Sequence, residues 1–67
     1  MKIGNKIKEL RKSKNLSQTS LGKILGTTQD TISLWELNKS LPDIEMLKKI
    51  CIEFDVSADF LLGLKEI

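Results

Sequence analysis

The stretch LSQTSLGKILGTTQDTISLWELNKSLP, residues 16–42, contains two short segments whose apolar residues recur at spacings of three and four. This spacing places the apolar residues on one face of a helix that packs on a core. They are Leu21, Ile24 and Leu25 in the first segment and Ile32 and Trp35 in the second. About three residues centred on Gly26 join the two segments, and this short connection predicts a helix-turn-helix.

The other residues of the second segment are mostly short hydrogen-bonding groups rather than the Lys and Glu of an ordinary solvated helix. Such residues are indifferent helix formers, so we expect their face to have a binding role. In the first segment, a glycine at position 22 destabilises the helix by about 1 kcal/mol relative to alanine. Gly22 is either a weak point or a place where the second helix crosses closely, and we favour the close crossing.

The same periodicity runs through the rest of the chain, and no run alternates with period two, so we expect an all-α fold without a sheet. The remaining stripes are Ile3, Ile7 and Leu10; Ile44, Leu47, Cys51 and Phe54, with Ile50 beside them; and Val56, Leu61 and Leu62. Capping residues predict where the helices begin and end. Ser17, Thr28, Asp43 and Ser57 stand before helices, and Asn15, Gly26, Asn38 and Asp55 stand after them. Pro42 separates the third helix from the fourth, which gives five helices packed around one core.

The length of 67 residues fits one small domain, which we expect to span residues 1–67 with its core between residues 3 and 63. Cys51 is the only cysteine, which excludes an intrachain disulfide and fits a reducing cytoplasm. There is no signal peptide or long apolar run, so we expect no membrane insertion. The chain has no histidine and no nucleophile or phosphate-loop motif, so we expect no metal, no cofactor and no enzymatic activity.

Charge is distributed unevenly along the chain. Residues 1–40 carry eight basic and three acidic side chains, whereas residues 41–67 carry three basic and six acidic ones. A basic half and an acidic half favour one side that faces a polyanion such as nucleic acid. Surface charges also scatter in this way by chance, and a basic patch steers binding without specifying it.

Residues 16–42 resemble the helix-turn-helix of the phage repressor and Cro family, also known for xenobiotic-response-element regulators. The matching residues are Leu16, Ser17, Gln18, Gly22, Gly26, Thr28, Gln29, Ile32, Trp35, Glu36, Lys39 and Pro42. The resemblance continues through EMLKKICIEFDVSADFLLG, residues 45–63, and covers nearly the whole chain. Three residues depart from the family pattern. Gly22 replaces the usual Ala, Asn38 replaces the usual Gly, and Leu34 stands where relatives often carry a polar base-reading residue.

The resemblance implies a compact five-helix, lambda-repressor-like DNA-binding domain with the helix-turn-helix at its second and third helices. It implies a transcriptional regulator that binds double-stranded DNA at specific sequences. We expect a repressor that binds a palindromic operator as a homodimer, although the residues equally permit activation. The third helix would lie in the major groove, where base edges present distinct donors and acceptors. The alternative is an antitoxin-type module that masks a partner enzyme with its acidic fourth and fifth helices and autoregulates its operon.

Five residues of the third helix are candidates for contact with bases. Gln29 stands in the first turn, and its amide can bond both N6 and N7 of adenine. Asp30 either accepts a hydrogen bond from cytosine N4 or is only stabilised by the positive end of the helix dipole. Thr31 and Ser33 would contact a base or a phosphate, or Ser33 would face solvent. Leu34 either touches a thymine methyl group or packs on a neighbouring side chain.

A second set of residues would contact the phosphate backbone. Gln18 and Thr19 begin the second helix, whose N-terminal amides can hold a phosphate. In the family, the glutamine at the Gln18 position also braces the first glutamine of the recognition helix. The other strand would be lined by Thr28, Asn38, Lys39 and Ser40. These contacts fix register but read no sequence, and the alternative is a capping threonine beside a solvated loop.

The remaining predictions concern structure and assembly. In relatives an arginine of the first helix often pairs with the glutamate after the tryptophan, so we expect a structural ion pair between Arg11 and Glu36. At helical spacing from its neighbours, Trp35 belongs in the core rather than on a base, and Cys51 is a buried small hydrophobe. After the core positions are assigned, Phe60, Leu64 and Ile67 remain as a dimer seam, or alternatively as a frayed apolar tail.

Overall fold

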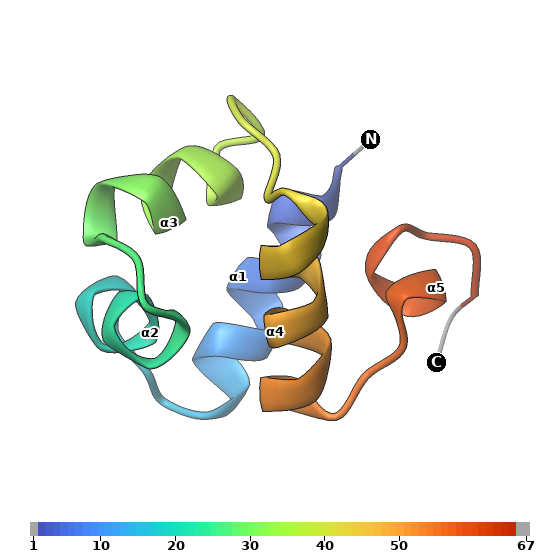
Figure 1. Ribbon diagram of the computed structural model, residues 1–67, viewed down its shortest axis with the longest axis horizontal. Coiled ribbons are helices and arrows are strands. Elements are labelled where there is room, and N and C mark those ends of the chain that lie inside the picture. Colours follow the sequence, from blue (N-terminus) through green and yellow to red (C-terminus); the bar gives the residue numbers. More distant parts are fainter. Residues whose placement is uncertain (1, 66–67) are drawn as a thin grey trace.

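The computed structural model describes residues 2–65, which form five helices and no strand (Figure 1). The helices are α1 (Ile3–Ser13), α2 (Gln18–Leu25), α3 (Gln29–Glu36), α4 (Ile44–Phe54) and α5 (Ala58–Leu61). In Figure 1, α2 and α3 lie on one side of the central helices α1 and α4, and α5 lies on the other side. The all-α prediction is therefore confirmed.

Side-chain caps begin four of the five helices where the sequence predicts them. The side-chain oxygens of Ser17, Thr28, Asp43 and Ser57 each accept a hydrogen bond from the backbone amide three residues later. These bonds measure 2.8–3.2 Å. Each bond satisfies one of the amides that a helix leaves unpaired at its first turn, which is why these short polar residues define the boundaries.

The predicted helix ends also agree with the backbone. Asn15, Gly26, Asn38 and Asp55 all have positive φ angles, between 54° and 75°. This left-handed conformation turns the chain out of the helix, and Asn, Asp and Gly tolerate it better than other residues do. Local sequence therefore determines where α1 to α4 stop.

The core is made of apolar side chains from all five helices. Its buried members are Ile3, Ile7, Leu21, Leu25, Ile32, Trp35, Ile50, Phe54 and Leu61. Burial of Trp35, with 3% of its surface exposed, confirms the prediction that it is a core residue. Cys51 is only half-buried at the edge of this core, so the prediction of a buried cysteine is correct only in part.

Two apolar residues that the periodicity places in the core are on the surface. Ile44 is 85% exposed and Ile24 is 46% exposed, whereas Ile50 is fully buried. In α4 two overlapping stripes have helical spacing, and the packing selects the one that passes through Ile50 and Phe54. In α2 the buried face follows Leu21 and Leu25, so Ile24 falls at the margin.

Two glycines allow backbones to approach closely. A Cβ atom at Gly22 would lie 3.1 Å from the carbonyl oxygen of Thr27, where the chain enters α3, so the predicted close crossing is confirmed. A Cβ atom at Gly4 would overlap the carbonyl oxygen of Trp35. The backbone of α1 thus passes directly against the end of α3, which the sequence did not predict because the two segments are far apart in the chain.

Candidate nucleic-acid interface

The exposed face of α3 presents the five side chains that the sequence marks for base contact. Gln29 and Asp30 are exposed in the first turn, Thr31 and Ser33 are half-buried, and Leu34 is 43% exposed. The opposite face of α3 is held in the core by Ile32 and Trp35. The helix therefore faces solvent on one side while its other side is fixed in the core. A helix that enters a groove of DNA needs this arrangement.

A hydrogen bond joins the first residues of α2 and α3. The Nε2 atom of Gln29 donates to Oε1 of Gln18 across 2.6 Å. The Nε2 atom of Gln18 in turn donates to Oε1 of Glu36 across 3.1 Å. The amide of Gln29 is therefore held at the surface by a side chain that is itself anchored at the end of α3.

Arg11 of α1 and Glu36 of α3 form a two-pronged ion pair beneath this surface. Arg11 Nε and Nη2 donate to the two carboxylate oxygens of Glu36 at 2.6 and 3.0 Å. Arg11 Nη1 also donates to the carbonyl oxygen of Leu16 at 2.8 Å. The two side chains are only 11% and 4% exposed. The pair thus ties α1, the α1–α2 loop and α3 together.

Each member of this ion pair stabilises the charged form of the other. The hydrogen bond to Glu36 raises the pKa of the Arg11 guanidinium, although its burial opposes this. Burial by itself would raise the pKa of the Glu36 carboxyl. Hydrogen bonds from Arg11 and Gln18, with attraction by Arg11 and Lys8, outweigh burial and hold that pKa below its ordinary value. Glu36 is therefore an ionised acceptor at neutral pH.

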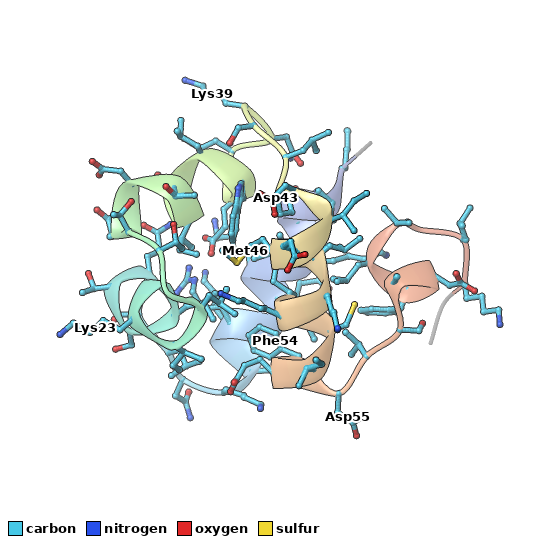
Figure 2. All side chains as sticks on the ribbon, in the orientation of Figure 1. Lys23, Lys39, Asp43, Met46, Phe54 and Asp55 are labelled. Atoms are coloured by element: carbon cyan, nitrogen blue, oxygen red, sulfur yellow. The ribbon has the colours of Figure 1, made fainter. Side chains whose placement is uncertain are left out.

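The candidate phosphate-contacting residues surround α3 but differ in what their side chains already do. Thr19 and Lys39 are exposed, and Figure 2 shows Lys39 extending outward from the loop after α3. Ser40 is half-buried, as is Gln18, which braces Gln29. Thr28 caps α3 and shares a 3.0 Å hydrogen bond with the hydroxyl of Thr31.

Asn38 has a role within the protein that its sequence position did not reveal. Its Oδ1 atom accepts from the backbone amide of Gly4 at 3.0 Å, and its Nδ2 atom donates to Oδ1 of Asn5 at 3.1 Å. Because α1 has no side-chain cap from its own N-cap residue, Asn38 supplies the missing acceptor from the end of α3. No local pattern marks this contact, since 34 residues separate the two partners.

The apolar residues proposed for a dimer seam are not equally free. Phe60 is half-buried against the core, and the ammonium group of Lys6 lies 5.0 Å from its ring centre. Leu64 is 72% exposed. Ile67 lies outside the described residues. Within residues 2–65, Leu64 is therefore the seam candidate that most clearly faces solvent.

The described residues contain neither a cluster of metal ligands nor a helix that could span a membrane. Within residues 2–65, no group of three or more acidic, cysteine or histidine side chains is arranged to hold a metal ion. None of the helices in this range has both the length and the apolar character needed to span a bilayer.

Comparison with known proteins identifies the arrangement of α2 and α3. A family model described as helix-turn-helix matches residues 7–61. The chain belongs to this helix-turn-helix family. It is the Cro/C1-type family of DNA-binding transcription regulators, so the resemblance to phage repressors is confirmed.

Two relatives similar to this chain have different names, one a transcriptional activator and the other an antitoxin. The chain is 39% identical over its whole length to the HTH-type transcriptional activator BcrR of Enterococcus faecalis, of which it covers 33%. It is 34% identical over 91% of its length to the antitoxin PezA of Streptococcus pneumoniae, of which it covers 39%. The chain thus spans between a third and two fifths of these two relatives.

A solved helix-turn-helix structure has the same fold. The chain superimposes with a TM-score of 0.83 on the P22 c2 repressor, which was crystallised in complex with a synthetic operator. The two share 32% sequence identity, and the match covers 88% of this chain and 89% of the repressor chain. The five helices of this chain therefore have the phage-repressor fold.

Proposed function

We propose that this chain is a sequence-specific, double-stranded DNA-binding transcriptional regulator that represses by occupying an operator overlapping a promoter. The observation that carries the proposal is the exposed polar face of α3, whose first residue, Gln29, is held in place by Gln18. Membership in the helix-turn-helix family and similarity to an operator-bound repressor support it. In this motif the second helix lies in the major groove with its N-terminal residues on base edges.

Under this proposal the face of α3 reads bases. Gln29 bonds N6 and N7 of an adenine, and Asp30 accepts from N4 of a cytosine. Leu34, which is 43% exposed, contacts a thymine methyl group. Thr31 and Ser33 are half-buried and contact a base or a phosphate at the margin of the face.

The backbone contacts would lie on both sides of α3. Gln18 and Thr19, with the N-terminal amides of α2, hold one phosphate strand. Lys39, Ser40 and Thr28 line the other. The Asn38 side chain is engaged by α1, so a phosphate contact at this residue would have to coexist with its two bonds to Gly4 and Asn5. These contacts set register, and Lys39 supplies charge to the salt-dependent part of binding.

We propose that the chain binds a palindromic operator as a homodimer. A single module of this kind buries only about 600–1,000 Å² on DNA, which limits its selectivity. A two-fold dimer places two recognition helices about 34 Å apart on successive turns of one duplex face. The exposed side chain of Leu64, with the half-buried Phe60 beside α1, supports a seam at the α5 end of the chain.

A second candidate function is that of an antitoxin-type module that binds a partner protein. The similarity to PezA favours it, because that relative is an antitoxin. The acidic residues of α4 and α5 would then face the partner, and DNA binding would serve autoregulation. A chromosomal neighbour that encodes a small toxic enzyme, and that copurifies with the chain, would distinguish this function from simple repression.

Selection of bound duplexes from a random pool, followed by footprinting at stated salt concentrations, tests the proposal. We expect an enriched palindrome whose half-sites are about one helical turn apart, with protection of both halves. Binding that shows no enriched sequence and disappears steeply with salt would be non-specific and would contradict sequence reading. Protection of a single half-site by one protein would contradict the dimer alone.

A further inference from the structure

Four side chains from three helices form an unbroken chain of hydrogen bonds. It runs from Arg11 of α1 to Glu36 at the end of α3, then to Gln18 at the start of α2, and ends on Gln29 at the start of α3. The first three are largely or partly buried, and Gln29 is exposed. A buried ion pair is thus connected directly to the side chain proposed to read a base.

Each of these hydrogen bonds can have its donor on one side only. An ionised carboxylate accepts hydrogen bonds and donates none, so Gln18 must turn its Nε2 atom toward Glu36. This leaves Oε1 of Gln18 facing Gln29, which must then turn its own Nε2 atom toward Gln18. The charge on Glu36 therefore fixes the orientation of two amides, of which the second is at the surface.

This orientation determines what Gln29 offers to a base. One Nε2 hydrogen of Gln29 is donated to Gln18. Within residues 2–65, its Oε1 atom and its second Nε2 hydrogen are then left to bind a ligand. One acceptor and one donor complement adenine, whose major-groove edge presents the N6 donor and the N7 acceptor. Guanine presents two acceptors there, O6 and N7, so Oε1 of Gln29 would face O6 without a proton between them.

We propose that Glu36, which is buried away from any DNA, is a positioning residue for base choice, because through Gln18 it holds Gln29 in the orientation that selects adenine over guanine. This inference rests on the proposed function, in which Gln29 reads a base. Without the carboxylate, Gln18 can turn its amide over. Gln29 can then turn as well and present both of its N–H groups, which suits the two acceptors of guanine.

Replacing Glu36 alone would leave Arg11 buried without a partner and could unfold the protein. The test therefore uses the double variant Arg11→Met/Glu36→Met, since replacing a buried ion pair by apolar side chains of similar volume is often neutral or stabilising. A second variant, Gln18→Leu, keeps the ion pair and removes its connection to Gln29. It also removes the phosphate contact proposed for Gln18, which should weaken binding to both duplexes alike and leave their ratio unaffected. Thermal unfolding of each variant establishes that it is folded at the temperature of the binding measurement.

The measurement is the ratio of dissociation constants for the selected operator and for the same operator with guanine at the adenine read by Gln29. We expect a wild-type ratio of about tenfold or more, and a ratio near one in both the double variant and Gln18→Leu. Lys39→Ala serves as the matched control, because loss of a proposed phosphate contact should weaken binding to both duplexes and leave the ratio unchanged.

A folded double variant that keeps the full preference for adenine would overturn the role of Glu36 while leaving the proposed function intact. A wild-type protein with no base preference at any step would overturn the proposed function and the role of Glu36 together. Loss of preference in the double variant and in Gln18→Leu, with melting temperatures near that of the wild type, would establish that Glu36 acts through amide orientation rather than through stability.

Discussion

Gln29 and Gln18, the first residues of α3 and α2, share a hydrogen bond of 2.6 Å between their side-chain amides. This contact joins the two helices of the motif at the end that faces outward. It restricts a long, flexible side chain before any ligand arrives, which lowers the entropy cost of ordering that side chain on binding.

Gln29→Ala should weaken binding to the selected operator by about 1–3 kcal/mol and relax preference at one base-pair step, because a bidentate amide contact is lost. Repeating the selection with the variant checks this, since the change should be confined to one position in each half-site. Equal loss of affinity for every sequence would show that Gln29 does not read a base.

Lys39→Ala should weaken specific and non-specific binding alike and lower the slope of log affinity against log salt by about one unit. The physical reason is that one fewer phosphate would be neutralised, so fewer counterions would be released. Titrations at several salt concentrations provide the measurement, with Lys65→Ala, a lysine beyond α5, as a control. An unchanged slope would place Lys39 away from the backbone.

Arg11→Met should lower the free energy of unfolding by about 3–5 kcal/mol, because it leaves the carboxylate of Glu36 buried without its ion-pair partner. That carboxylate is only 4% exposed, so water cannot replace the guanidinium. Denaturant unfolding measures the loss. The double variant Arg11→Met/Glu36→Met should recover most of the stability, and a double variant as unstable as the single one would contradict this account of the pair.

The pH dependence of stability should reflect Glu36. Its pKa in the folded protein lies below the ordinary value of 4.5, so the stability it contributes is present above pH 4.5 and is lost as pH falls through the folded value. The wild type should therefore lose stability relative to Arg11→Met/Glu36→Met as the pH is lowered from above 4.5 through the folded pKa of Glu36. A difference that stays constant over this interval would show that Glu36 is not preferentially ionised in the folded state.

Gly4→Ala should destabilise the fold by about 1–3 kcal/mol or more, as expected for overpacking against a fixed backbone. The added Cβ atom would overlap the carbonyl oxygen of Trp35 and lie 2.8 Å from Oδ1 of Asn38. Gly22→Ala is the matched comparison, because the nearest atom would be 3.1 Å away and small shifts can relieve that contact. Equal melting temperatures for the two variants would contradict the close approach at Gly4.

Sequence reasoning succeeded where the determinants are local. The capping side chains of Ser17, Thr28, Asp43 and Ser57 bond amides only three residues away, so a short pattern specifies each helix start. It failed at Ile44 because residues 44 and 50 both have helical spacing from the rest of α4, and only packing decides between them.

The remaining features depend on contacts between distant parts of the chain. The seating of Gly4 on Trp35 and the bonds from Asn38 to α1 join segments more than thirty residues apart. The direction of the bonds among Glu36, Gln18 and Gln29 depends on side-chain rotamers that no spacing encodes. The family resemblance identified which residues gather at this site, but it did not show how their hydrogen bonds are oriented.

Under the proposed function, Gln29 reads an adenine from the major groove. The most direct measurement replaces that adenine in the operator with 7-deazaadenine, which keeps base pairing but removes the N7 acceptor. We predict that the wild-type protein loses about 1 kcal/mol or more of binding free energy on this substitution, and that Gln29→Ala, which cannot use N7, loses none. Equal binding of the wild type to both duplexes, or an equal loss for wild type and Gln29→Ala, would contradict the claim.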